Sequence, residues 1–369
     1  MKIGIITIHN SCNYGAVLQA FATQESFKKY GDVEILNYRN THTDKPTKLL
    51  RFGTKPKDAL RLAKDILKLL PKTRILKKFR FFFAEHYNLS GQPSQNLEVV
   101  EKKYDIYVCG SDQIWNPQII SEDGKIDKNY FLAFSGTGKK ISYASSMGSY
   151  SYTSTESLEI KTYLQDFHRI SVRESDTAQF LSTTLQREVD HVLDPTLLLN
   201  KKEWTSVLNI KDDSPKKSYM LVYVLRNSKI LSETVKAVAE ALDLDIIVID
   251  QDPFTTLRCT THINDAGPID FVKLFSNASF VITNSFHGCA FSVNFNIPFL
   301  ITPPPSGLNR IMSLLSAVGA ETRAINTRNQ AIETAQKEVD FDKINLQLDI
   351  LRSKSKKFIS DSIESIELT

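Results

Sequence analysis

Short apolar runs rich in Ile, Val and Tyr alternate along this chain with segments of helical periodicity, and no other feature of the sequence constrains the fold as strongly. Strands that alternate with helices build βαβ units, in which the strands lie parallel in one sheet and the helices cover its faces. We therefore expect an α/β protein. In the first half of the chain the predicted strands are 2–9, 33–38, 104–109, 140–144 and 170–173, and helices begin near residues 15, 154 and 175.

A second series of alternating elements follows, after a stretch near residue 200 in which the periodicity lapses and charged residues become frequent. Its predicted strands are 219–225, 245–249, 280–283 and 299–302, with helices at 228–242, 269–276, 288–295 and 308–317. We expect two Rossmann-like domains, 1–199 and 200–369, the second with a long closing helix at about 342–366. Two such halves facing a cleft resemble the glycosyltransferase-B architecture, in which ligands bind at the carboxyl ends of both sheets.

The charge of the chain is unevenly distributed. The stretch 45–80 holds thirteen Lys or Arg and two acidic residues, although the net charge of the whole chain is only +4. It forms the core of an expected basic helical insertion at about 45–88, in which Lys57, Arg61, Lys64 and Lys68 share one helical face. This helix either packs on its own domain with a solvated basic face, or contacts an anionic membrane or a polyanionic substrate. We expect no nucleic acid, because no recognition motif is present and the remaining chain is net acidic.

Composition also limits the compartment and the cofactors. The four cysteines have no metal-binding spacing, which favours reduced thiols. The first ten residues indicate a buried strand rather than a secretory signal, and no run of 18 apolar residues predicts a membrane span. We expect a cytoplasmic protein without a metal cluster or an organic cofactor, although a magnesium ion carried with a substrate stays compatible with the sequence.

Two polar turns follow predicted strands of the first domain. The first feeds a helix through Asn13, Tyr14 and Gly15, whose backbone N–H groups could bind an anion or a sugar oxygen, unless this turn is a simple cap. The second turn places polar residues beside one Trp. Its members are Ser111, Asp112, Gln113 and Trp115. This combination suits sugar stacking, and its alternative is an Asp-capped turn with a core Trp.

The same domain offers one arginine and one further carboxylate. Arg173 follows a predicted strand, and a guanidinium binds phosphate or carboxylate with two parallel hydrogen bonds. Alternatively, it forms a surface pair with Glu174. Asp194 precedes Pro195 and is therefore extended, which either projects its carboxylate into a cleft or shapes the linker.

The most informative turn lies in the second domain. A buried strand at 280–283 ends in Asn284 and Ser285, and His287 and Gly288 then open a helix of small residues. The imidazole thus lies at a helix amino terminus, where N–H groups favour anions, and could act as a general acid or base. The alternative is a structural histidine.

Together these motifs resemble the polysaccharide pyruvyl transferase family: Asn-Tyr-Gly-Ala-Val-Leu-Gln, Gly-Ser-Asp-Gln-Ile-Trp-Asn, Ser-Val-Arg-Glu-Ser, Leu-Asp-Pro-Thr and Asn-Ser-Phe-His-Gly, in order over 10–290. Members transfer pyruvate from phosphoenolpyruvate to a sugar as a ketal, on a fold similar to glycosyltransferase-B. The resemblance implies phosphoenolpyruvate and a sugar or lipid-linked glycan as partners. It also implies that Arg173 and His287 serve donor binding and catalysis, with His287 as the acid or the phosphate contact.

The resemblance leaves one gap in the site. Some family members carry an arginine two residues before the histidine, where this chain has Ser285. Arg226 and Arg310 are the possible replacements, and Asp112 and Asp194 are the candidates for the base.

Two other functions compete with pyruvyl transfer. A glycosyltransferase of the same fold with a nucleotide-sugar donor has only Asp243-Leu244-Asp245 in its favour, and acids are common at such a helix-to-strand turn. A noncatalytic glycan-binding protein would bind sugar and lack a phosphoenolpyruvate site.

Overall fold

The computed structural model describes residues 1–47, 69–99, 104–136, 138–211, 217–225, 228–252, 255–303 and 308–367. The chain divides into two compact units. Unit 1 comprises Met1–Thr47, Phe83–Leu198 and Ile350–Thr369, and unit 2 comprises the described residues 69–82 together with Leu199–Asp349. This partition differs from the expected domains 1–199 and 200–369 in two respects. The end of the chain returns to unit 1, and part of the basic insertion belongs to unit 2.

The described part of unit 1 contains one parallel sheet in the order β3-β2-β1-β4-β5-β6-β7. Its strands are β1 (Lys2–Ile6), β2 (Asp32–Tyr38), β3 (Leu89–Ser94), β4 (Ile106–Cys109), β5 (Lys139–Ser145), β6 (Arg169–Val172) and β7 (Asp190–His191). The central strands are buried on both faces, which explains why they are continuous apolar runs. Sequence periodicity missed β3 and β7, because both lie at the edges of the sheet and consist largely of polar residues.

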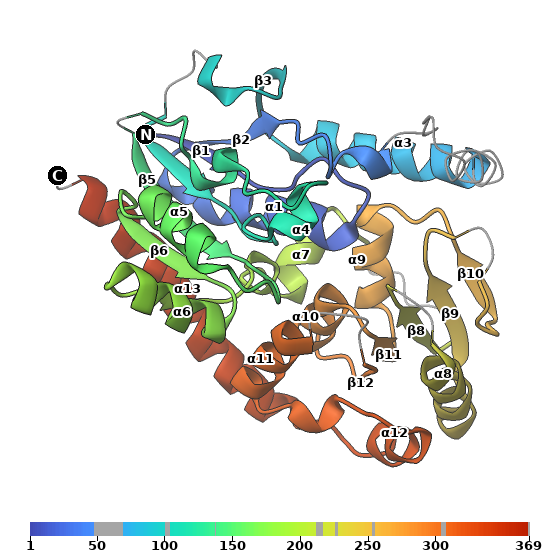
Figure 1. The fold of residues 1–369 in the computed structure, drawn as a ribbon. Coiled ribbons are helices and arrows are strands. Elements are labelled where there is room, and N and C mark those ends of the chain that lie inside the picture. Colours follow the sequence, from blue (N-terminus) through green and yellow to red (C-terminus); the bar gives the residue numbers. More distant parts are fainter. Residues whose placement is uncertain are drawn as a thin grey trace. The chain divides into compact units, whose positions relative to one another are not determined.

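Helices cover both faces of this sheet. They are α1 (Tyr14–Phe27), α4 (Pro117–Ile120), α5 (Ser154–Leu164), α6 (Ser175–Leu185) and the last part of α13 (Phe341–Glu367), with short 3-10 turns at Lys28–Tyr30 (η1), Lys45–Thr47 (η2), Leu97–Val99 (η3), Lys128–Phe131 (η4) and Pro195–Leu197 (η5). Helices α5 and α6 lie together beside β5 and β6 (Figure 1). On the other face, Phe27 of α1 and Phe358 of α13 both contact the ring of Tyr143.

The described part of unit 2 contains a second parallel sheet, in the order β10-β9-β8-β11-β12. Its strands are β8 (Tyr219–Tyr223), β9 (Asp245–Ile249), β10 (Thr261–Ile263), β11 (Phe280–Thr283) and β12 (Phe299–Ile301). Its helices are α7 (Lys201–Val207), α8 (Lys229–Leu242), α9 (Pro268–Ser276), α10 (Phe286–Asn294), α11 (Leu308–Val318), the 3-10 turn η6 (Glu321–Arg323), and α12 (Arg328–Ala335). The two parallel sheets confirm the predicted α/β class with two Rossmann-like halves.

Each sheet has a point at which the strand order reverses. This switch point lies between β1 and β4 in unit 1, and between β8 and β11 in unit 2. In parallel α/β sheets, ligands bind in the crevice outside the carboxyl ends of the strands at the switch point. The turns singled out in the sequence at 10–15, 110–116 and 284–288 follow β1, β4 and β11, and thus lie at these edges.

The basic insertion is described only in part. Residues 48–68, including the predicted face of Lys57, Arg61, Lys64 and Lys68, lie outside the described residues, and α3 (Leu69–His86) follows them. Within α3, Lys78 pairs with Asp270 at 2.8 Å and Arg74 with Asp265 at 3.5 Å, all in unit 2. Among the helices that the structure describes, none is long and apolar enough to cross a membrane.

Candidate functional site

The switch point of unit 1 is held together by a side chain of the first loop. Thr7 Oγ1 donates to the backbone oxygen of Ser111 at 2.8 Å, which joins the loops after β1 and β4. Gln19, from α1, donates in turn to Thr7 Oγ1 at 2.9 Å. Asn13 caps α1, since its Oδ1 accepts from Ala16 N at 3.2 Å. The expected turn at Asn13, Tyr14 and Gly15 is therefore a capped helix start, with Tyr14 and Gly15 buried.

Trp115 occupies a different environment from the one expected for a sugar platform. The residue is 1% exposed, its Nε1 donates to Tyr130 O at 2.9 Å, and its ring stacks on Phe131 at a centroid distance of 5.3 Å. The indole therefore belongs to the apolar core of unit 1. The prediction that it stacks on sugar is corrected, because no face of the ring is open to a ligand.

Arg173 and Asp194 form a buried ion pair at the same edge. Arg173 Nη1 donates to Asp194 Oδ2 at 2.7 Å, and the two side chains are 2% and 0% exposed. Ser111 Oγ donates to the same oxygen at 3.1 Å. The other carboxylate oxygen of Asp194 accepts from Thr196 N and Thr196 Oγ1. Four donors thus fix Asp194, which leaves it poorly suited to accept a proton.

Glu174 is a second carboxylate on the same guanidinium. Its Oε1 accepts from Arg173 Nε at 3.3 Å and from Ser146 Oγ at 2.6 Å, and the residue is 1% exposed. The expected surface pair of Arg173 and Glu174 is therefore a core pair. Burial alone would lower the pKa of Arg173, but the charges of Asp194 and Glu174 outweigh it and raise this pKa. A phosphate would have to compete with two carboxylates already bonded to Arg173.

Asp112 is half-buried, whereas Asp194 and Glu174 at the same edge are buried, and its backbone is left-handed, with φ 71°. Ser146 N donates to Asp112 O at 3.1 Å, and Asp112 Oδ1 accepts from Gln113 N at 2.9 Å. A residue other than glycine with positive φ costs free energy and is frequent at functional sites, although Asp tolerates this conformation better than most residues.

The switch point of unit 2 is built from the turn after β11. Asn284 Oδ1 accepts from Leu225 N at 2.8 Å, which joins the loops after β8 and β11. Thr283 Oγ1 donates to Tyr223 O at 2.5 Å and accepts from Ser285 N at 3.1 Å. A Cβ at Gly288 would lie 2.2 Å from Thr283 Oγ1, so the first turn of α10 can pack on this threonine only with glycine at 288.

His287 is the second residue of α10 and 7% exposed. Its ring meets the ring of Phe286 edge to face, with centroids 5.2 Å apart. The helix begins after Ser285, whose backbone is extended and whose side chain makes no capping hydrogen bond to the helix. The predicted strand, turn and helix are therefore present, and they place the imidazole at the start of a helix.

The two arginines expected to replace the missing one have different outcomes. Arg226 lies outside the described residues, and Arg310 is the third residue of α11 with a half-buried side chain. Arg323 is a buried arginine that sequence reasoning missed, but its guanidinium donates to the backbone oxygens of Thr334, Lys337 and Glu338. These bonds make Arg323 a structural cap of the turn after α12.

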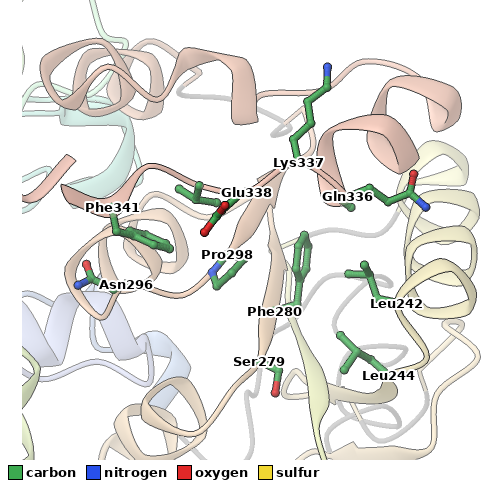
Figure 2. A pocket seen from close by; sticks show the side chains of 12 residues that line it. Leu242, Leu244, Ser279, Phe280, Asn296, Pro298, Gln336, Lys337, Glu338 and Phe341 are labelled. Carbon is green, nitrogen blue, oxygen red and sulfur yellow. The ribbon is translucent and has the colours of Figure 1, made fainter. Parts of the chain in front are cut away.

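A cavity of about 500 Å³ lies at the opposite, amino-terminal edge of the unit 2 sheet. Figure 2 shows Phe280 and Pro298 between Leu242 and Leu244 on one side and Phe341 on the other. Asp243 ends α8, and Asp245 begins β9 beside this cavity. The Asp-x-Asp motif of the competing glycosyltransferase prediction thus lies at the edge away from His287.

Several residues at these edges carried too weak a sequence signal to be predicted. Thr7, Gln19 and Ser146 are single polar residues inside or beside apolar segments, and each is buried. A polar residue inside or beside an apolar segment is the only sign in the sequence of such a buried hydrogen-bonding role. In the described ranges, no group of three or more His, Cys, Asp or Glu could hold a metal ion.

Comparisons with known proteins bear on both the family and the fold. The family model described as polysaccharide pyruvyl transferase matches residues 13–303. No curated protein matches the chain. A protein from Listeria monocytogenes assigned as a UDP-N-acetylglucosamine 2-epimerase is similar in structure, with TM-score 0.53 and 11% identity over 100% of this chain and 97% of that one. The glycotransferase of kitacinnamycin gives TM-score 0.50 and 12% identity over 98% and 99%. At such identities the likeness concerns the fold alone, which is glycosyltransferase-B-like.

Proposed function

Because the chain belongs to the polysaccharide pyruvyl transferase family, and is thus a transferase, we propose that it moves pyruvate from phosphoenolpyruvate onto a sugar of a surface or capsular polysaccharide, or of its lipid-linked precursor. The product is a ketal, and phosphate is released. The observation that carries this proposal is the turn from β11 into α10, where a helix start and His287 coincide at a switch point.

The reaction defines what the site has to supply. The methylene carbon of phosphoenolpyruvate gains a proton and becomes a methyl group, while a sugar hydroxyl bonds to C2. The bond from C2 to the phosphate oxygen then breaks, and a second hydroxyl closes the ketal. Each hydroxyl loses its proton, one proton restores the acid and the other leaves with phosphate. The reaction therefore needs an acid, a base and donors for a trianionic ligand.

The start of α10 answers the demand for an acid and for donors. The backbone N–H groups of a first helical turn and the helix dipole favour an anion at such a position. His287 lies in this first turn, and we assign to it the proton for the methylene carbon or the contact to phosphate. Asn284 and Ser285 flank the same turn, and Arg310 is the described candidate for the cation that Ser285 does not provide.

Asp112 answers the demand for a base better than Asp194. The residue is half-buried, and its strained backbone is typical of functional positions. Asp194 has both oxygens bonded to donors and is buried. We therefore assign to Arg173 and Asp194 a positioning role for the loop that carries Asp112, in place of direct contact with phosphate.

The proposal is tested by phosphate release from phosphoenolpyruvate with purified protein and a panel of glycan acceptors. We expect release only when an acceptor is present, and a loss of about 100-fold or more in His287→Asn. His168→Asn is the matched control. His168 precedes β6 at the amino-terminal edge of the unit 1 sheet, and its ring is hydrogen-bonded to Ser365. Turnover with a nucleotide sugar, or none with any acceptor, contradicts the proposal.

For the location, we propose the cytoplasm, with peripheral contact at the inner face of the membrane, where lipid-linked glycans are assembled. One face of α3 carries Leu70 and Phe81, which are 73% and 56% exposed, with Arg74 and Lys77 between them in the helical repeat. Co-sedimentation with vesicles should rise with their anionic lipid content and fall with salt. Binding that ignores both variables contradicts this location.

A further inference from the structure

Three polar side chains near the turn after β1 contain buried atoms to which the described residues make no hydrogen bond of ordinary geometry, although Asn37 lies close enough to the His9 ring to raise its pKa. These atoms are His9 Nε2, Asn10 Nδ2 and Gln19 Oε1. The residues are 3%, 9% and 0% exposed. Buried polar atoms nearly always find a partner, so three exceptions within one turn and the helix after it call for a ligand or for ordered water.

The three residues belong to one place in unit 1. His9 Nδ1 lies 3.2 Å from Thr7 O, and Gln19 Nε2 donates to Thr7 Oγ1 and to Ile8 O. His9 and Gln19 thus both contact Thr7, which is the residue that joins the loops after β1 and β4. The cluster lies at the switch-point edge of unit 1, where a ligand is expected.

The chemistry of the cluster selects the kind of ligand. A backbone oxygen only accepts, so the Nδ1 of His9 carries the hydrogen in its contact with Thr7 O, and Nε2 presents a lone pair. Burial lowers the pKa of His9 to about 4, so the ring is neutral at pH 7. Gln19 Oε1 is a second acceptor, and Asn10 Nδ2 is a donor. Two acceptors and one donor disfavour an ionised phosphate or carboxylate, whose oxygens only accept.

We propose that His9, Asn10 and Gln19 form a subsite for the hydroxyl groups of a sugar. A hydroxyl both donates and accepts, so two hydroxyls of one sugar can donate to His9 Nε2 and Gln19 Oε1 while one of them accepts from Asn10 Nδ2. The identification of this sugar as the acceptor of pyruvate rests on the proposed function. Water offers the same hydroxyl chemistry, and the experiment has to separate the two.

The experiment measures binding without turnover. Methyl glycosides of glucose, galactose and mannose are titrated against the protein by saturation-transfer NMR, and phosphoenolpyruvate is titrated separately by calorimetry. We expect at least one glycoside to bind. The dissociation constant for this glycoside should rise about tenfold in His9→Phe, which keeps a ring and removes the bond to the sugar together with the contact to Thr7 O. His168→Phe should leave glycoside binding unchanged, and the affinity for phosphoenolpyruvate should stay the same in both variants.

A pair of substitutions at Asn10 tests whether the ligand groups are hydroxyls. Asn10→Leu removes the donor and should weaken glycoside binding about fivefold to tenfold. Asn10→Asp replaces the donor by an acceptor, to which a hydroxyl can donate, so it should weaken binding less than Asn10→Leu. Thermal unfolding of each variant checks that it is folded, and His9→Phe remains decisive if either is not.

Two results overturn the subsite. One is that no glycoside binds, and the other is that His9→Phe binds glycosides as the unaltered protein does, in which case the cluster holds water. Neither result affects the proposed function, which depends on phosphate release from phosphoenolpyruvate. Conversely, glycoside binding that depends on His9, in a protein without such turnover, would keep the subsite and refute pyruvyl transfer.

Discussion

At the carboxyl edge of each sheet, one hydrogen bond joins the two loops at the switch point, but the charged side chains beside this bond differ between the two units. In unit 1, Thr7 donates to the backbone of Ser111 across the switch point, and in unit 2 the backbone of Leu225 donates to Asn284. Next to this shared kind of bond, unit 1 surrounds one buried guanidinium with the carboxylates of Asp194 and Glu174. Unit 2 instead presents an uncharged turn and the start of a buried helix.

This difference indicates that the two edges suit different ligands. In unit 1 the single positive charge of Arg173 faces two carboxylates, so that a neutral, hydroxyl-bearing ligand fits better than an anion. In unit 2 the helix start has donors and a favourable dipole, which suit an anion. The shared fold thus supplies two crevices, and the local charges give each crevice its own chemistry.

The largest effect on the free energy of unfolding should follow from removing the buried guanidinium of Arg173 in unit 1. Arg173→Met leaves Asp194 and Glu174 buried without their counter-charge, so the free energy of unfolding should fall by about 3–5 kcal/mol. Urea unfolding measures it. The control is Arg74→Met, which removes an exposed pair with Asp265 and should cost less than about 1 kcal/mol. Equal losses in the two variants would show that the carboxylates of the unit 1 edge do not depend on Arg173.

A steric change should be the largest single effect in unit 2. Gly288→Ala places a Cβ 2.2 Å from Thr283 Oγ1, and relief of this clash should cost about 2 kcal/mol of unfolding free energy. Thr283→Ala removes Oγ1, the nearest obstructing atom, and Cγ2, at the cost of the hydrogen bonds of Thr283, and leaves only the Cβ of residue 283 at 2.9 Å. The double variant should therefore be more stable than the sum of the single losses predicts, with a coupling of about 1 kcal/mol. Strict additivity contradicts the packing described for α10.

The free energy of unfolding should depend on pH through His9, the buried histidine of unit 1. The folded protein holds the pKa of His9 at about 4, below its ordinary value of 6.5, so the unfolded chain binds the proton first as the pH falls. Stability is then unaffected above pH 6.5 and is lost progressively between pH 6.5 and 4. The loss amounts to about 2 kcal/mol at pH 5.

The comparison of the unaltered protein with His9→Phe isolates this contribution, because both proteins share every other titrating group. Urea unfolding at pH 7 and pH 5 should show a steeper loss for the unaltered protein. Parallel losses in both proteins would mean that His9 is not held neutral by burial.

The sequence predicts those features of the two edges that depend on residues close together in the chain, and it misses those that depend on residues far apart. The central strands and the turns that follow them are local patterns, and their positions were predicted to within a few residues. The neighbouring Glu174 was predicted as a partner of Arg173, but Asp194 was not, because it is 21 residues away and only the fold brings the two together. The burial of Trp115 was missed for a similar reason, since Phe131 lies in a short 3-10 turn without periodicity. Pairing at a distance is thus what the structure adds.

The smallest effect on stability should come from the strained loop of unit 1. Asp112→Gly relieves the positive φ but loses the hydrogen bond from Gln113 N, and each change is worth about 0.5–1 kcal/mol, so that they offset one another. The free energy of unfolding should therefore change little, while phosphate release falls about 100-fold because the proposed base is gone.

Gln186→Gly is the matched control. Gln186 has φ 53° at the end of α6, so glycine should add up to about 1 kcal/mol of stability there without loss of turnover. Full turnover in Asp112→Gly would return the role of base to another residue and leave the carboxylates of unit 1 with a structural role only.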